Sequence, residues 1–404
     1  MWNIWRFMMK KQFFFGILFL FVTANLVAQS EKNVYRFSID IENAIEQDTI
    51  PGKYQIGANE YSFIGNYKKT RETWDKNFVG IPKITDEDSL YFIGFTPVCA
   101  RDYIIERSKN ERIIIINEAH TYPNHRTFTH SILQGLYDNG YRYLGLESLF
   151  DTIINERKYP ILESGYYTKE PEFGNLIYAA INIGFTLFSY EEGFGKNGKE
   201  REIEQAENIV NFMTKHPHAK MLIHCGHDHV IEGDVLSWEK AMAGRLKEYT
   251  QIDPFTIEQT QFSEKGDKKY NHPYIAMVNK EYPVVLIDKN GTLFNGRKNS
   301  DRVDCVIVHP ETHYVNNRPN WLLREEGRKE YFIESSKIVQ YPLLVLAYRK
   351  NELENNGVPT DIIEILDNDN TPSLILNKGD YEIIMKDSYY NIINRYDRYD
   401  IKIE

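Results

Sequence analysis

The chain has 404 residues, of which 42% are apolar and 26% charged, and its formal net charge is −10. These values are ordinary for a globular protein with one large domain and one or two smaller ones. The acidic balance disfavours nucleic acid as a partner, and three cysteines are too few for a disulfide framework.

The first 28 residues have the pattern of a signal peptide. Arg6, Lys10 and Lys11 precede an apolar run over 13–22, and small or apolar residues lead to a predicted cut after Ala28. An uncleaved anchor is the alternative, because residues 12–30 carry no charge. We expect export to the periplasm or the cell exterior, with membrane contact only through this segment if it is uncleaved. Removal of residues 1–28 would take away three basic residues and change the net charge to −13.

Residues 29–100 are predicted to form a mixed, partly helical arm. Over 60–74, aromatic and apolar residues recur at roughly helical spacing, and Pro51-Gly52 stands at the entry of this segment. The pattern predicts an amphipathic helical hairpin. We interpret the arm as a packing element without chemistry.

Residues 101–315 alternate between strand-like and helix-like patterns, and we expect one α/β domain there. The predicted strands cover 112–117, 143–146, 185–190, 220–223, 255–258 and 303–308. The predicted helices cover 125–139, 175–183, 199–215 and 235–249. Repeated βα units predict a mainly parallel sheet with helices on both faces.

The pattern changes again in residues 320–404. Strand-like runs cover 339–347, 373–376 and 381–385, with Pro359, Pro372 and Gly379 among the residues between and around them. This predicts a small C-terminal β-rich domain, for which a sandwich is one arrangement.

Ionisable residues follow three of the predicted strands, at the point where each strand ends. Ile113-Ile-Ile-Ile-Asn-Glu-Ala-His120 ends in Glu118 and His120, Tyr143-Leu-Gly-Leu-Glu147 ends in Glu147, and 220–223 leads into His224-Cys-Gly-His-Asp-His229. Open α/β sheets bind their ligands at the carboxyl ends of the strands. We therefore predict one pocket of carboxylates and imidazoles, with Glu118, His120, Glu147 and His229 as candidate catalytic residues.

The same residues supply candidate metal ligands. Clustered histidines favour a divalent metal such as zinc, manganese or iron, and we take Glu118, His120, His227 and His229 as the ligand candidates. The chain has no His-Glu-x-x-His, no Gly-x-Ser-x-Gly, no P-loop and no Rossmann fingerprint. Cys225 is interpreted as a packing residue. His125 stands at a predicted helix N-terminus, which favours a neutral imidazole able to act as a ligand.

Taken in order, these residues resemble the ChaN-like branch of a group that includes erythromycin esterases, TraB proteins and Tiki metalloproteases. The resemblance covers about 105–310. Glu118 and His120 match the opening Gly-Glu-x-His, although Asn117 replaces the glycine. The remaining matches are His125 for the helix histidine, Glu147 for the second-strand glutamate and His229 for the late Gly-x-x-His. The helix with Arg201, Glu202, Gln205 and Asn208 resembles the Arg-acidic helix of erythromycin esterases.

The resemblance implies an α/β fold with a Glu/His pocket, and it makes His125, Arg201 and Glu202 candidate cofactor-binding residues. Two functions follow from its members. The first is an exported hydrolase that activates water on an ester or amide of a small molecule or peptide, with or without a divalent metal. The alternative is a haem- or iron-binding uptake protein of the ChaN type, and a non-catalytic binding protein is a third hypothesis. Fold likeness alone does not decide among them.

Overall fold

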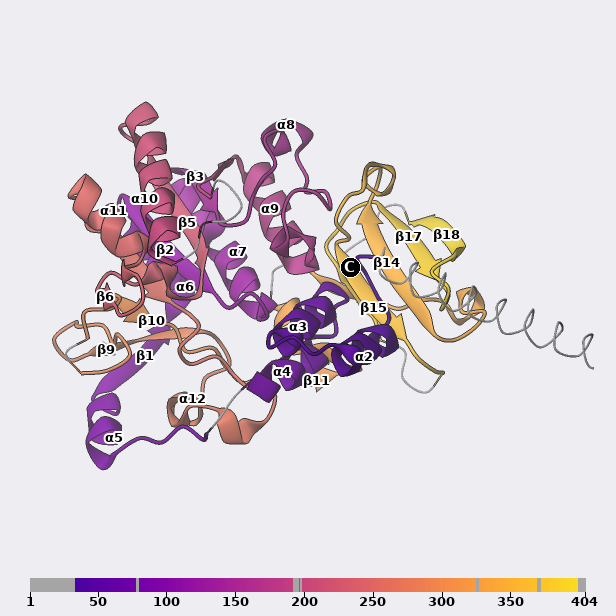
Figure 1. Cartoon of the computed structure of the whole chain (residues 1–404), viewed down its shortest axis with the longest axis horizontal. Helices are drawn as coiled ribbons and strands as arrows, with labels where there is room; N and C mark the ends of the chain where they lie inside the picture. Colours follow the sequence, from indigo (N-terminus) through magenta and orange to yellow (C-terminus); the bar gives the residue numbers. More distant parts are fainter. Residues whose placement is uncertain are drawn as a thin grey trace, which may run out of the picture.

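The computed structural model describes residues 33–398 except 78–79, 192–195, 197, 299, 325–326 and 369–371. The predicted signal peptide therefore lies outside the described residues. An α/β part and a C-terminal sheet lie side by side, and the helices of the arm run beneath the latter (Figure 1). In the part of the chain that is described, no helix has the length and apolarity needed to cross a membrane.

Six parallel strands form the central sheet of the α/β part. Their order is β10-β8-β2-β5-β3-β4, so β5 lies between β2 and β3. The strands are β2 (Ile113–Glu118), β3 (Tyr141–Leu146), β4 (Thr186–Ser189), β5 (Lys220–Gly226), β8 (Phe255–Glu258) and β10 (Cys305–Val306). The apolar run at β2 is buried along its whole length, as expected for a central parallel strand.

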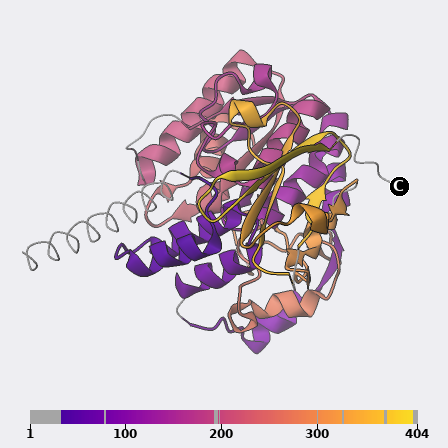
Figure 2. The same cartoon turned by 90° about the vertical axis from the view of Figure 1, so that its right-hand side faces the viewer.

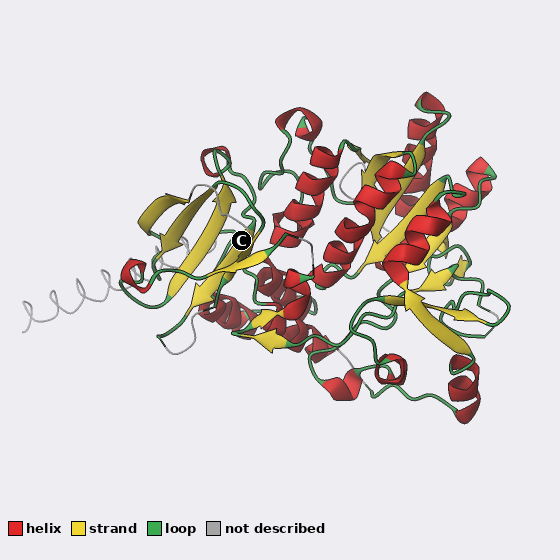
Figure 3. Ribbon diagram, turned by 180° about the vertical axis from the view of Figure 1, so that it is seen from behind, coloured by secondary structure: helices red, strands yellow, loops and turns green. Residues whose placement is uncertain are grey.

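Helices cover both faces of this sheet (Figure 3). Ile114 and Ile116 of β2 pack in one apolar layer with helices α6 (Ala100–Ser108), α7 (Pro123–Asp138) and α9 (Pro171–Ile183). Ile113 and Ile115 face the opposite layer, which contains α10 (Gly198–Lys215) and α11 (Met242–Thr250). The alternation follows from the two-residue period of a strand. The predicted α/β class, with a parallel sheet between helical layers, is confirmed.

A separate antiparallel sheet forms the C-terminal β-rich part. Its order is β15-β14-β17-β18, with β14 (Leu343–Arg349), β15 (Asp361–Ile365), β17 (Tyr381–Lys386) and β18 (Ile392–Arg398). A two-stranded ladder of β13 (Lys329–Tyr331) and β16 (Leu374–Leu376) belongs to the same part. The sequence patterns did not predict β15 or β18.

The arm packs on this C-terminal sheet (Figure 2). Its helices are α2 (Ser38–Gln47), α3 (Lys53–Phe63) and α4 (Tyr67–Trp74). Ile41 of α2 and Tyr61 of α3 share one apolar cluster with Leu344 and Leu346 of β14. The two ends of the described chain therefore form one packed unit.

The predicted helix over 235–249 is corrected at its start. Residues 234–240 form a small hairpin of β6 (Asp234–Val235) and β7 (Glu239–Lys240), and α11 begins only at Met242. Glu239 has φ = +64°, a left-handed conformation that a helix cannot contain. The hairpin brings Trp238 onto the ring of His229, with centroids 5.5 Å apart.

The other described elements are short or peripheral. β1 pairs with β9 in an antiparallel ladder beside the main sheet. The elements are α5 (Asp86–Phe92), β1 (Phe95–Cys99), α8 (Ile154–Arg157), α12 (Pro273–Val278), β9 (Val284–Asp288), β11 (Tyr314–Val315) and β12 (Arg318–Pro319), with short 3-10 helices that include Tyr167–Lys169, His227–Val230 and Asn320–Leu323.

Candidate functional site

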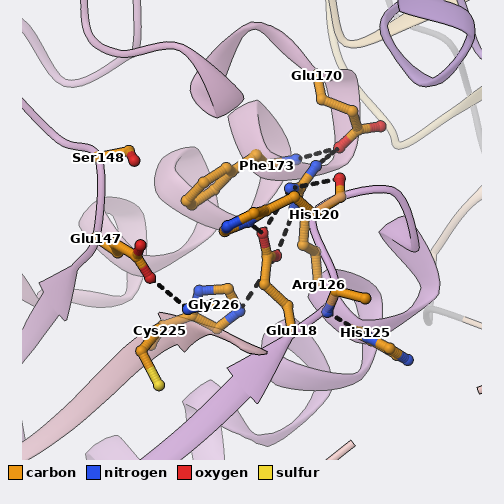
Figure 4. Close-up of polar contacts among 12 residues, drawn as sticks. Glu118, His120, His125, Arg126, Glu147, Ser148, Glu170, Phe173, Cys225 and Gly226 are labelled. Atoms are coloured by element: carbon orange, nitrogen blue, oxygen red, sulfur yellow. Dashed lines mark hydrogen bonds and ion pairs between the residues drawn. The ribbon is translucent and has the colours of Figure 1, made fainter. Parts of the chain in front are cut away.

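The carboxyl ends of β2, β5 and β3 meet at one edge of the sheet (Figure 4). Glu118 is paired in register with Gly226, and the backbone N–H of Glu147 donates to the carbonyl of His224 over 3.2 Å. The backbone N–H of Gly226 in turn donates to the carboxylate of Glu147. The structure therefore brings Glu118, Glu147 and the histidine segment of 224–229 together.

Glu118 is a buried carboxylate held by two side chains. Arg126 of α7 donates to both of its oxygens, through Nε and Nη2, each over 2.6 Å. The Nδ1 atom of His120 lies 2.9 Å from Oε1. Burial alone would raise the pKa of the Glu118 carboxyl, but Arg126 and His120 outweigh it and hold this pKa well below its usual value. Glu118 is therefore ionised at neutral pH.

Arg126 joins Glu118 to a second buried carboxylate. Its Nη1 atom donates to Glu170 over 2.8 Å, and the guanidinium is fully buried. Glu170 also accepts from the backbone N–H of Phe173 and from the hydroxyl of Tyr67, a residue of the arm. Burial, together with Glu172, raises the pKa of Glu170 to about 7 against the opposing effect of Arg126. The arm thus reaches the shell that surrounds the site.

His120 presents one free ring nitrogen to the centre of the cluster. An ionised carboxylate can only accept, so the hydrogen bond to Glu118 places the proton of neutral His120 on Nδ1 and leaves a lone pair on Nε2. A Cβ atom added to Gly226 would lie 2.5 Å from that Nε2 and 3.1 Å from Oε2 of Glu147. The ring stacks on Tyr167 with centroids 3.7 Å apart, and the side chain is 13% exposed.

Glu147 is the centre of the other half of the cluster. Its Oε1 accepts from Nη2 of Arg201 over 2.5 Å and lies 3.5 Å from Nε2 of His229. Burial would raise the pKa of Glu147, but His229, His120 and Arg201 lower it to about 2. Arg201, which is 30% exposed, also donates to Glu191. Glu147 is consequently a carboxylate under all ordinary conditions.

His229 forms a second carboxylate–imidazole pair with Glu202. Its Nδ1 lies 2.8 Å from Oε1 of Glu202, whose other oxygen accepts from the backbone N–H of Met242. Burial alone would lower the pKa of His229, but Glu147 and Glu202 outweigh it and raise the pKa above its ordinary value. Arg201 and Glu202, predicted as cofactor-binding residues, thus lie in the cluster.

Replacement of Glu202 by glutamine is expected to lower the pKa of His229, because one of the two carboxylates that favour the imidazolium is removed. The measurement is an NMR titration of the imidazole C–H signals, with Glu200→Gln on the exposed face of α10 as the matched control. Because the pKa of His229 is raised in the folded state, its protonation stabilises the fold fully below the ordinary value of 6.5. This stabilisation is lost as the pH rises from that value through the folded-state pKa. The stability of the wild type should therefore fall relative to that of the variant as the pH rises through this range. An unchanged titration of His229 would contradict the pairing.

His125 is not part of the cluster. Its Nδ1 accepts from the backbone N–H of Ala119, and its Nε2 lies 3.3 Å from the hydroxyl of Ser263. The ring points away from Glu118 (Figure 4) and lies against His309. Burial, followed by His309, lowers the pKa of His125 well below its usual value. This corrects the expected place of His125, whose ring nitrogens face Ala119 and Ser263 and not the cluster around Glu118.

His227 and His224 occupy different positions around His120. The ring of His227 is edge-on to that of His120 at 5.2 Å and is stacked on Trp74 of the arm at 6.4 Å. Its backbone has φ = +43°, and its carbonyl accepts from the side chain of Asn117 over 2.7 Å. The side chain of Asn117 thus holds His227 in a backbone conformation that is rare for residues other than glycine.

His224 is buried beneath Glu118. Its Nε2 lies 3.6 Å from Oε2 of Glu118 and has no hydrogen-bond partner among the described residues. Burial lowers the pKa of His224 to about 4, so the ring is neutral. The neighbouring Cys225 is buried, and its thiol pKa is raised by burial, which does not favour a nucleophilic thiolate.

The donor set does not fit a divalent metal. Glu118 is bonded at both oxygens by Arg126, and Glu147 is bonded by Arg201 and by Gly226. Within the described ranges, no three or more His, Cys, Asp or Glu side chains are arranged to hold a metal ion. A haem needs an apolar slot beside its ligand, whereas two carboxylates and two guanidinium groups line this cluster. The predicted ligands Glu118, His120, His227 and His229 thus lie near one another without forming a metal centre.

Several residues of the cluster were missing from the sequence-based prediction. Arg126 lies one residue after His125 and had no motif of its own. Glu170 carried one usable signal, because Glu170-Pro171 is a helix start in which the Glu170 side chain caps the N–H of Phe173. The stacking partners Tyr167, Trp74 and Trp238 are set by tertiary contacts that no local pattern encodes.

The chain matches no protein-family model and no curated protein. Among solved structures, it is similar to one titled "The structure of the type III effector HopBA1", with 9% sequence identity. The similarity covers 44% of this chain and 94% of that chain, with a TM-score of 0.31. A likeness this distant assigns neither a family nor an activity.

Proposed function

We propose that this chain is an exported hydrolase that activates water against an ester or amide carbonyl, with His120 as the general base. The observation that carries the proposal is the pairing of His120 with the buried, ionised Glu118. That pairing fixes the ring and leaves Nε2 as a proton acceptor beside Gly226 and Glu147. A general base has to combine this orientation with access for water, and the side chain of His120 is partly exposed.

In the proposed reaction, Nε2 of His120 takes a proton from water while the water oxygen bonds to the carbonyl carbon. The bond from that carbon to the leaving oxygen or nitrogen then breaks, and His120 returns the proton to the leaving group. The new acid loses a proton to solvent. Arg201, the partly exposed cation of the cluster, is suited to stabilise the negative charge that develops on the carbonyl oxygen.

The other residues of the cluster hold His120 in place and do not react themselves. Glu118 holds the tautomer of His120 and stabilises the imidazolium that forms, as the carboxylate does in other acid–imidazole pairs. Arg126 and Glu170 in turn fix Glu118. The proposal includes export of the chain and a small molecule or a peptide as the substrate.

The test is hydrolysis by the purified mature chain of a panel of aryl esters, alkyl esters, amides and short peptides, with and without a chelator. We expect turnover of at least one class that the chelator leaves unchanged and Glu118→Gln abolishes. Turnover that Glu118→Gln does not alter would count against the site, and no turnover of any class would favour a binding protein. A Soret band on haem titration, lost in His120→Ala, would favour the alternative of haem uptake.

A further inference from the structure

A cavity of about 300 Å³ lies outside the candidate site. Its walls come from the end of β1, the start of α6, one face of α7, the segment before β9, the segment after β10 and the 3-10 helix at 320–323. It is lined by Cys99, Arg101, Asn124, Thr127, Phe128, Ser131, Glu281, Tyr282, Pro283, His309, Trp321 and Arg324. The cavity therefore lies where the α/β part joins the segment that leads to the C-terminal sheet, and ligand sites are common at such junctions.

Helix α7 separates this cavity from the candidate site. The cavity is lined by four residues of α7 at positions 124, 127, 128 and 131, a spacing that places them on one face of a helix. Arg126 lies on the opposite face and points to Glu118 and Glu170. None of the cavity residues contacts Glu118 or His120 through a hydrogen bond or ion pair that the structure describes, so the two sites are distinct.

The inner wall is aromatic and buried. Phe128 and Trp321 are buried, and the ring of Phe128 is edge-on to His309 at 5.7 Å. His309 is fixed by a hydrogen bond of 3.0 Å between Nε2 and Gln259. Burial, together with Arg324, lowers the pKa of His309 to about 3, so this wall is neutral. Such a surface suits a compact apolar body, and an aromatic ring above all.

The rim is cationic in a protein whose net charge is negative. Arg101 and Arg324 line the cavity, and among the described residues that line it Glu281 is the only acidic one. Arg101 is oriented by a hydrogen bond of 3.0 Å from Nε to the carbonyl of Ser131. The guanidinium of Arg324 makes no hydrogen bond or ion pair with another described residue. A planar guanidinium with unused donors matches the geometry of a carboxylate.

We propose that this cavity binds a small organic carboxylate with an aromatic or compact apolar body, its carboxylate at Arg324 and Arg101 and its body against Phe128 and Trp321. The cavity volume is at the lower end of the range for ligand sites and therefore fits a molecule of about one ring. The proposal does not rest on the hydrolase function, since no residue is shared between the two sites.

The test is isothermal titration calorimetry of the mature chain with benzoate, and with benzyl alcohol as a probe that keeps the ring but has no charge. We expect saturable one-to-one binding of benzoate and at least about tenfold weaker binding of the alcohol. Arg324→Gln and Arg101→Gln change exposed side chains, so both variants should fold, and circular dichroism checks this. Each is expected to weaken benzoate binding by about tenfold.

The matched control is Arg297→Gln, which removes one exposed positive charge outside the cavity and should leave the affinity unchanged. His120→Gln should also bind benzoate normally, and a loss there would place the anion in the candidate site and overturn the proposal. Equal binding of benzoate and benzyl alcohol, wild-type affinity in both cavity variants, or no binding of benzoate would overturn it as well.

Discussion

Replacement of Arg126 by methionine is expected to lower the free energy of unfolding by about 3–5 kcal/mol, as in other cases where one partner of a buried ion pair is removed. The guanidinium is fully buried and donates to both Glu118 and Glu170. Without it, two buried carboxylates lose their common counter-charge. Urea unfolding followed by circular dichroism measures the change, and Arg201→Met, at a partly exposed arginine with two carboxylate partners, should cost less.

The same variant has an expected dependence on pH. With the guanidinium removed, burial dominates and raises the folded-state pKa of both carboxyls above that of the unfolded chain. Groups of this kind favour the folded state while protonated and lose that contribution as pH rises, so the deficit should be larger at about pH 8 than at about pH 5. Arg126→Met combined with Glu118→Gln and Glu170→Gln should recover much of the stability. A triple variant no more stable than the single one would contradict this account.

Replacement of His120 by glutamine is expected to lower kcat for the best substrate of the panel by about 100- to 10,000-fold, the usual contribution of a general base. The KM should change little, because the ring acts on water and not on the distant parts of the substrate. Glutamine keeps a polar side chain beside Glu118, so the fold should be retained. The experiment compares steady-state kinetics and melting curves of the two proteins.

The control for this variant is His218→Gln, which changes an exposed histidine before β5 and should leave kcat unaltered. A kcat for His120→Gln within a few-fold of the wild type would show that another group activates the water. A parallel loss of kcat and thermal stability would instead assign His120 a structural role.

The fold class could be predicted because its signals are local and strong. Four consecutive β-branched isoleucines in a short apolar run favour a strand buried on both faces, and βα alternation then indicates a parallel sheet. Since all strands of such a sheet end at one edge, the convergence of Glu118, Glu147 and the 224–229 segment also follows from the pattern. The start of α11 could not be predicted, because the sequence before it also fits a helix. In the structure this segment forms a hairpin, and its Trp238 makes a tertiary contact with His229 that no local pattern encodes.

The error for His125 follows from the rotation of helix α7 about its own axis. Neighbouring positions on a helix point about 100° apart, so when α7 turns Arg126 toward Glu118 it turns His125 toward His309 and Ser263. The helix start was recognisable from the sequence, but its rotation about its own axis was not. Glu170 and Tyr67 could not be predicted for a related reason. Glu170 contacts Arg126 and Tyr67, and both contacts join segments that are distant along the chain.

The packing of the arm on the C-terminal sheet has a consequence for how the protein is made. The backbone N–H of Phe37 donates to the hydroxyl of Tyr390, a residue 353 positions later, and α2 and α3 bury their apolar side chains against β14 and β17. During synthesis these helices lack their partners in the C-terminal sheet until its strands exist, and contacts of such long sequence separation form slowly. We therefore expect the apolar faces of α2 and α3 to stay exposed in a nascent chain until β14 and β17 have been made.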